Sequence, residues 1–252
     1  MIAVKVNSGG DIRRHRGFLL SEAWYMDQGA ALIKKDFGYS DALRSVLEEL
    51  GAEDWVPTHP DGPYESDGWK VVPFVEFGRE TPMMERFPVM AKVLQEFKCP
   101  VKMMVYYNML PGAKIHPHRD TSGTLELGFL RFHVPIRTNE QVDFRVDNVA
   151  VPMREGQLWA LNTSHKHAVS NLSNSDRVHL VLEVEVNQCV RSVLPGRTYR
   201  YYLHVIGFGG VVAAKTVGAL FKPARFASYV RTAKTRLAER RNRGQEKVQG
   251  GS

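Results

Sequence analysis

The sequence predicts a mostly β fold of the sandwich or jelly-roll type, and three observations lead to this prediction. From Val101 onward, short runs rich in β-branched and aromatic residues recur along the chain. Turn clusters such as PGAK, RTNE, MREG and SNSD separate these runs, a spacing typical of sandwiches and jelly rolls. The chain has 252 residues, of which 43% are hydrophobic and 24% charged, the proportions of a soluble globular protein that can bury a core.

Before this β-rich part, the sequence predicts two helices, one strand and a loop. Helix formers with apolar spacing indicate the helices, alternation indicates the strand, and Gly, Pro and Asp mark the loop. Residues 21–50 are rich in helix formers, and an amphipathic helix is expected at 41–50. In chain order it should be followed by a loop at 51–68, a strand at 69–77, and a helix within 84–97 that begins near Pro88. The helix at 41–50 should pack on the sheet, and the loop could close over a site as a lid.

The strand-like runs of the β-rich part define the expected core. They are VKMMVYYNM at 101–109, FLRFHVPI at 129–136, VDFRVDN at 142–148, QLWALN at 157–162 and VHLVLEVEV at 178–186. Large apolar residues in these runs alternate with polar neighbours, so we expect Phe132, Phe144, Trp159 and Leu161 to pack in the interior.

The positive charge of the chain is concentrated after the β-rich part. From Arg191 to Ser252 there are 13 Lys and Arg against 2 acidic residues, a balance of +11, so residues 1–190 carry about −4 of the total +7. We therefore expect a domain at 1–190 and a basic, partly helical C-terminal extension at 191–252. Nucleic acid is not an expected partner of the main domain.

The extension has three interpretations: a solvated helix at the edge of the sandwich, an arm that contacts anionic lipid or nucleic acid, or an element that docks a protein partner. Its apolar run GFGGVVAAKTVGALF, followed by basic residues, would suit peripheral membrane contact. Cys99 and Cys189 have no paired spacing, so they suggest neither a disulfide framework nor a cysteine zinc site. Without a signal-peptide core or a run of ~20 apolar residues, a cytoplasmic protein is expected.

Two histidine clusters and one carboxylate suggest a metal site. In KIHPHRD, His118 and Asp120 are two residues apart at the end of a strand-like run, so their side chains point to the same side. A second cluster, SHKH, follows the run QLWALN and provides His167. Two histidines and one carboxylate that leave open positions are the ligand set of non-haem Fe(II) oxygenases.

Arg177 follows His167 by ten residues and precedes the run VHLVLEVEV. The planar guanidinium can bind a carboxylate through two parallel hydrogen bonds, which a lysine does less well. This residue is therefore a candidate anchor for a dicarboxylate co-substrate.

With these motifs in place, the chain resembles the aspartyl/asparaginyl β-hydroxylase family of Fe(II)- and 2-oxoglutarate-dependent dioxygenases, and the similar core of bacterial proline hydroxylases. The matching segments, all within about 68–187, are GWKVVPF at 68–74, ERFPV at 85–89, PGAKIHPHRD at 111–120, LRFHVPI at 130–136 and EGQLWALNTSHKHAVSNLSNSDRVHLVLEV at 155–184. The resemblance implies a double-stranded β-helix core, the cupin-like form of the jelly roll. It also implies Fe(II), 2-oxoglutarate and O2 as cofactor and co-substrates.

Carried over residue by residue, the resemblance implies that His118 and His167 bind iron and that Arg177 binds the distal carboxylate of 2-oxoglutarate. It places three further residues near the co-substrate: Tyr107, Arg131 and His133. The best-known animal peptide hydroxylases of the family lack the carboxylate ligand, whereas this chain has Asp120 in a full His-x-Asp motif. This difference favours hydroxylation of an unactivated carbon in an amino acid or an amino-acid-derived small molecule.

Several alternatives stay open from the sequence. The substrate could instead be a peptidyl Asp or Asn or a lipid-linked molecule, and the chain could be a non-catalytic cupin-like binding module or a zinc hydrolase. Arg131 and His133 could form a satisfied polar pair inside the barrel. The neighbouring His116 and His165 could be exposed loop residues or substrate contacts, and either could replace its neighbour as a ligand.

Overall fold

The computed structural model describes residues 29–57, 68–121, 123–195 and 199–220. The chain divides into two compact units, Met1–Tyr201 and Tyr202–Ser252. The first unit contains every strand found among the described residues. It is the part of the chain on which the metal-site residues lie.

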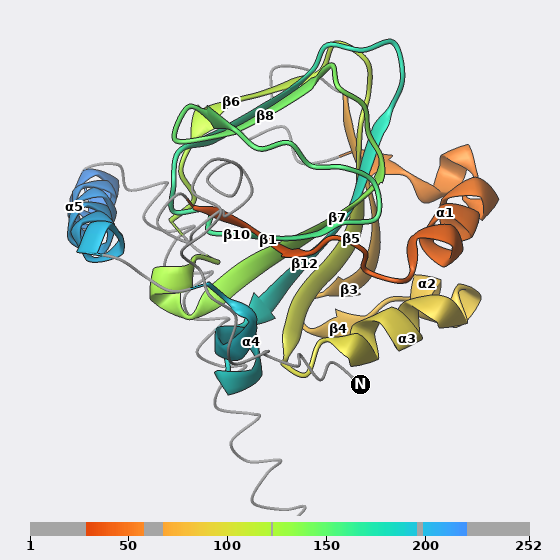
Figure 1. The fold of residues 1–252 in the computed structure, drawn as a ribbon, viewed down its shortest axis with the longest axis horizontal. Coiled ribbons are helices and arrows are strands. Elements are labelled where there is room, and N and C mark those ends of the chain that lie inside the picture. The colour runs from red at the N-terminus through yellow and green to blue at the C-terminus, as the bar shows by residue number, and fades with distance from the viewer. Residues whose placement is uncertain (1–28, 58–67, 122, 196–198, 221–252) are drawn as a thin grey trace, which may run out of the picture. The chain divides into compact units, whose positions relative to one another are not determined.

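Two antiparallel sheets form the first unit (Figure 1). The large sheet has the order β1-β10-β7-β12-β5-β3-β2, with β4 paired to β3. Its strands are β1 Ala30–Lys34, β2 Val56–Pro57, β3 Trp69–Glu76, β4 Arg79–Glu80, β5 Val101–Met109, β7 Phe129–Arg137, β10 Leu158–Leu161 and β12 Arg177–Glu185. The small sheet has the order β6-β11-β8-β9, with β6 Lys114–His118, β8 Val142–Val146, β9 Val149–Ala150 and β11 His167–Asn171.

One hydrophobic core lies between the two sheets. It joins Trp69, Met109 and Trp159 of the large sheet to Phe144 and Val169 of the small sheet. Two packed sheets of short antiparallel strands around one core confirm the prediction of a mostly β jelly roll.

The other face of the large sheet is covered by three helices, α1 Ser40–Glu49, α2 Pro82–Arg86 and α3 Pro88–Glu96 (Figure 1). Adjacent residues of β5 show the division, because Tyr107 packs against Trp69 of the core while Tyr106 points to the helices. The hydroxyl of Tyr106 donates a hydrogen bond of 2.9 Å to the main-chain carbonyl of Leu43 in α1. The sheet is therefore buried on both faces at this point.

The structure confirms most of the predicted elements and corrects three. The helix expected to begin near Pro88 is α3, as predicted, but the residues before it form a separate short helix, α2, and Phe87 caps both. Residues 30–34, within the region rich in helix formers, form the edge strand β1 because they pair with β10. The loop at 51–68 contains a 3-10 turn, η2 Ala52–Asp54, and the short strand β2, while residues 58–67, where a lid was expected, lie outside the described residues.

The end of the first unit and the second unit each contain a described helix. Helix α4 Gln188–Val193 begins at Asn187, whose side chain accepts a hydrogen bond from the amide of Val190. Helix α5 Tyr199–Leu220 contains the apolar run noted in the sequence, and Ile206 on it is 75% exposed. No described helix is both long and apolar enough to cross a membrane. The basic residues after 220 lie outside the described residues.

Candidate metal centre

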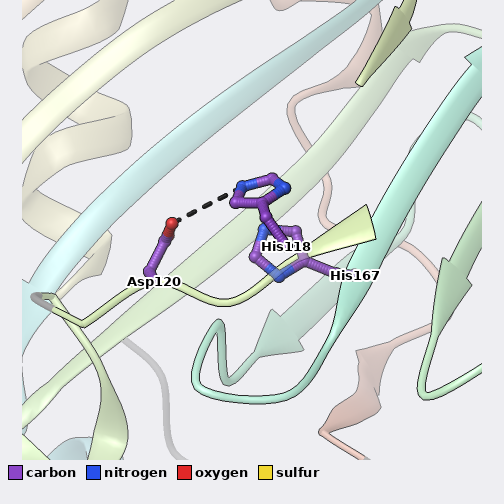
Figure 2. Close-up of side chains that lie close together, drawn as sticks. All are labelled: His118, Asp120 and His167. Carbon is purple, nitrogen blue, oxygen red and sulfur yellow. Dashed lines mark ion pairs between the residues drawn. The ribbon is translucent and has the colours of Figure 1, made fainter. Parts of the chain in front are cut away.

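The two histidines of the predicted triad lie on adjacent strands of the small sheet. In the antiparallel pair β6 and β11, His118 and His167 are direct register partners, and their ring centroids are 4.2 Å apart. Asp120 follows the end of β6 and turns toward His118 (Figure 2). One ligand atom from each of the three residues lies within 4.8 Å of the others. The β6–β11 register brings the two histidines together, and the turn of the chain after β6 adds Asp120 to them.

Both histidines present the same ring nitrogen to the centre. Nδ1 of His118 is 2.8 Å from the main-chain carbonyl of His116, and Nδ1 of His167 is 3.0 Å from that of His165. A carbonyl oxygen can only accept, so Nδ1 is the donor in each ring and Nε2 keeps its lone pair. Burial lowers the pKa of His167 to about 4, despite the opposing effect of Asp120. Its ring is therefore neutral at pH 7, as a metal ligand must be.

One oxygen of the Asp120 carboxylate lies near His118, and the other accepts a hydrogen bond from an arginine. Oδ1 lies 3.5 Å from Nε2 of His118, while Oδ2 accepts a hydrogen bond of 2.8 Å from Arg131. The same guanidinium donates to Glu183 at 3.2 and 3.3 Å. Burial alone would lower the pKa of Arg131, but the two carboxylates raise it, so the arginine stays charged.

The sequence reasoning placed Arg131 near the co-substrate and did not single out Glu183. In the structure the two are opposite each other on β7 and β12, and Arg131 links Glu183 to Asp120. The only sequence signal for this link would have been the cross-strand register of opposite charges.

Arg177 lies deep in the first unit with 2% of its surface exposed. Its Nη2 donates a hydrogen bond of 2.8 Å to Nδ1 of His179, and its guanidinium lies 5.9 Å from the ring centroid of Phe144. Among the described residues, no carboxylate pairs with Arg177, and its Nε has no hydrogen-bond partner. Burial lowers its pKa to about 9, so the guanidinium is a charged donor group at pH 7.

Two neutral histidines lie near this arginine, and a tyrosine is the cross-strand neighbour of one of them. His133 and His179 pack edge to face with centroids 5.9 Å apart, and within the described part Nδ1 of His133 and Nε2 of His179 are buried without a partner. Burial, aided by the charge of Arg177, holds the pKa of both rings well below the ordinary value. Tyr107 is the cross-strand partner of His179 and packs edge to face on Trp69. Donor groups that converge without an acidic partner fit a bound carboxylate.

The remaining histidines of the two clusters differ from each other. His116 is exposed as expected, but it lies within strand β6 rather than in a loop. His165 is 1% exposed, and its Nδ1 lies 2.6 Å from Oδ2 of Asp147. The expectation that it is an exposed loop residue is therefore wrong, because a non-local hydrogen bond to Asp147 holds the ring inside the fold.

The donor set fits a first-row divalent ion, since it consists of two imidazoles and one carboxylate. A sequence profile described as aspartyl/asparaginyl beta-hydroxylase matches residues 40–186, more than half of the chain. The chain belongs to this family. As an aspartyl/asparaginyl β-hydroxylase family protein, it is an Fe(II)- and 2-oxoglutarate-dependent oxygenase that uses O2.

Solved structures with a similar fold include other oxygenases of this kind. The carbocyclase SnoK from nogalamycin biosynthesis is 15% identical, with a TM-score of 0.48 over 71% of this chain and 87% of that chain. HygX from Streptomyces hygroscopicus with nickel and 2-oxoglutarate is 14% identical, with a TM-score of 0.43 over 65% and 85%. A Pseudomonas putida prolyl-4-hydroxylase is 15% identical, with a TM-score of 0.41 over 63% and 93%. These scores are too low to transfer a substrate to this chain.

Proposed function

We propose that this oxygenase hydroxylates an unactivated carbon of an amino acid or an amino-acid-derived small molecule. In this proposal His118, Asp120 and His167 hold the iron. The observation that carries this proposal is the convergence of their three donor atoms within 4.8 Å. It is supported by a buried arginine in the same unit, Arg177, that lacks an acidic partner among the described residues. Bound Fe(II) would supply the activation of O2 and of the C–H bond.

The residues of the chain prepare the site for this chemistry. The carbonyls that accept from Nδ1 of His118 and His167 fix both rings with Nε2 toward the ion. We assign Arg177 to the distal carboxylate of 2-oxoglutarate, because its unused Nε and its Nη atoms form a planar donor fork. A buried fork of this kind orients a dicarboxylate and excludes water from its binding site.

Three further residues are assigned by their contacts. We propose that Arg131 orients Asp120, because its guanidinium is already engaged by Asp120 and Glu183. His133 remains our candidate for the other end of the co-substrate, since besides burial both Arg177 and His167 lower its pKa. The neutral His133 could donate or accept a hydrogen bond there. Tyr107, the cross-strand partner of His179, remains our candidate for a further co-substrate contact.

The substrate preference rests on Asp120. A complete His-x-Asp motif distinguishes this chain from the animal peptide hydroxylases of the family and favours a small molecule over a peptidyl Asp or Asn. A lipid-linked substrate is the third choice. A non-catalytic module would have no use for the combination of metal donors and a buried arginine, and a zinc hydrolase would leave Arg177 without a role.

The organisation outside the site is also part of the proposal. We assign the oxygenase domain to 1–190 and a separate role to 191–252. The exposed Tyr202, Leu203 and Ile206 of α5, within a strongly basic part of the sequence, support contact with an anionic membrane surface or a protein. A cytoplasmic location peripheral to a membrane is consistent with this assignment.

The test is an anaerobic titration of the metal-free protein with Fe(II) and 2-oxoglutarate. We expect the visible iron-to-keto-acid charge-transfer band in wild type, its loss in His167→Ala, and a weaker or absent band in Arg177→Ala. Arg145→Ala is the matched control, because Arg145 is an exposed arginine paired with Asp143. A wild-type protein that binds neither Fe(II) nor 2-oxoglutarate would refute the proposal. If the band forms, the next measurement compares succinate release in the presence of amino acids, peptides and lipids.

A further inference from the structure

The loop between β10 and β11 supports both halves of the metal centre through its main chain. Three consecutive carbonyls of this loop accept hydrogen bonds from residues at the site. The carbonyl of Thr163 accepts from the amide of Asp120 at 2.9 Å. That of Ser164 accepts from Nη1 of Arg119 at 2.7 Å, and that of His165 accepts from Nδ1 of His167 at 3.0 Å. The orientation of these carbonyls therefore sets the positions of Asp120 and His167 relative to each other.

One residue outside the loop holds it in place. Asp147 lies in the turn between β8 and β9 with a φ of 46°, and its carboxylate points back to the loop. Oδ2 accepts from Nδ1 of His165 at 2.6 Å, and Oδ1 accepts from the amide of Lys166 at 3.0 Å. The amide of Asp147 donates to the carbonyl of Lys166 at 2.7 Å. Asp147 thus binds side chain and main chain of the segment that leads directly into His167.

The His165 ring completes this arrangement from inside the fold. It is almost fully buried, and the backbone of Gly29, with a φ of 73°, lies so close that an added Cβ would be 2.5 Å from the ring. Burial alone would raise the pKa of Asp147, but the hydrogen bond from His165 and the charges around it hold the pKa below its usual value. The pair is therefore a close-packed, charge-assisted contact.

We propose that Asp147 and His165 are positioning residues of the metal centre, which act through the carbonyls of residues 163–165 and touch neither metal nor substrate. The inference rests on the proposed ligand set. It assigns a role to His165, the first histidine of the SHKH cluster, which the ligand set leaves unused. A change in this pair should shift the relative geometry of Asp120 and His167 without removing any ligand atom.

The test compares metal binding by the full chain across a small set of variants. Asp147→Ala and His165→Leu remove the contact, whereas Asp147→Asn keeps the size and the acceptor for the Lys166 amide. His165→Asn places an amide N–H where Nδ1 stood, so it should rescue binding relative to His165→Leu. Asp143→Ala is the control, since Asp143 lies on the same hairpin and forms an exposed pair with Arg145.

Co(II) is the probe, measured by its dissociation constant and its visible ligand-field spectrum, with thermal unfolding of the metal-free proteins as a check on folding. We expect Asp147→Ala and His165→Leu to bind Co(II) about 10- to 100-fold more weakly with altered spectra, the two Asn variants to lie closer to wild type, and Asp143→Ala to match it. If the variants fold and keep the wild-type affinity and spectrum, the inference is refuted, and the proposed ligand set is not affected. If wild type itself binds no Co(II), both the inference and the proposed ligand set fall.

Discussion

Replacing Arg177 with methionine should make the ligand-free protein more stable and abolish its response to 2-oxoglutarate. Burial lowers the pKa of Arg177 from its ordinary value to about 9, which corresponds to roughly 5 kcal/mol of unfavourable free energy for the charged form. The folded pKa is depressed, so this penalty is fully present below pH 9 and disappears as the pH rises from there toward the pKa of an arginine in the unfolded chain. Methionine fills a similar volume without a charge.

The substitution also removes favourable contacts, which limits the gain. Arg177→Met loses the hydrogen bond to His179 and leaves Nδ1 of that ring unsatisfied, at a cost of about 3 kcal/mol. The net expectation is that the free energy of unfolding rises by about 2 kcal/mol at pH 7. In wild type, 2-oxoglutarate at 100 times its dissociation constant should add about 2.7 kcal/mol, because it binds only the folded state.

The assay is urea unfolding at pH 7 with Mn(II) in place of Fe(II), with and without 2-oxoglutarate. Wild type should be stabilised by the co-substrate, and Arg177→Met should be unaffected by it. The matched control is Arg145→Met, which removes an exposed arginine and should change neither quantity by more than about 0.5 kcal/mol. If Arg177→Met is several kcal/mol less stable than wild type and still responds to 2-oxoglutarate, then Arg177 is a structural residue and the reasoning is refuted.

Three further substitutions test the packing and the charge network. Tyr106→Phe removes a buried hydrogen bond to a main-chain carbonyl of α1 and should lower the free energy of unfolding in urea by about 1 kcal/mol; no change would deny that bond a role. Gly156→Ala forces a side chain at a φ of 78° and 2.6 Å from the Ser40 hydroxyl, so we expect a loss of about 1–3 kcal/mol, only partly recovered by Ser40→Ala. Glu183→Gln weakens the hold on Arg131 and should raise the Mn(II) dissociation constant by about tenfold, whereas an unchanged constant would show that this carboxylate does not act on the centre.

The proximity of His118, Asp120 and His167 was predictable only in part from local rules. The rule that residues two apart on a strand share a face put His118 and Asp120 on one side, although β6 ends at His118. Asp120 is held beyond the strand by hydrogen bonds to Arg131 and Thr163. Predicting the position of His167 required only that the strand after QLWALN pair with the strand that carries His118, and these two strands do pair in antiparallel. Arg177 was identified by its place at the start of β12, which the structure buries.

The parts that sequence did not reveal depend on contacts between distant segments. Residues 30–34 read as part of a helix-forming region, and only the free edge of β10 makes them a strand. Glu183 and Arg131 are 52 positions apart and become partners through the β7–β12 register. No local pattern distinguishes such a pair from charges that face solvent.

The two His-x-His clusters show why identical spacing can carry different meanings. In each cluster, the first histidine contributes its main-chain carbonyl to the ring of the second. Any residue supplies a carbonyl, so the exposed ring of His116 has no part in this contact. The ring of His165 does have a part, because Asp147 holds it and thereby holds the carbonyl that orients His167. The two clusters look alike in the sequence. Only Asp147, which lies in a turn distant in the sequence, gives the ring of His165 a role in positioning His167, a role that the ring of His116 does not have.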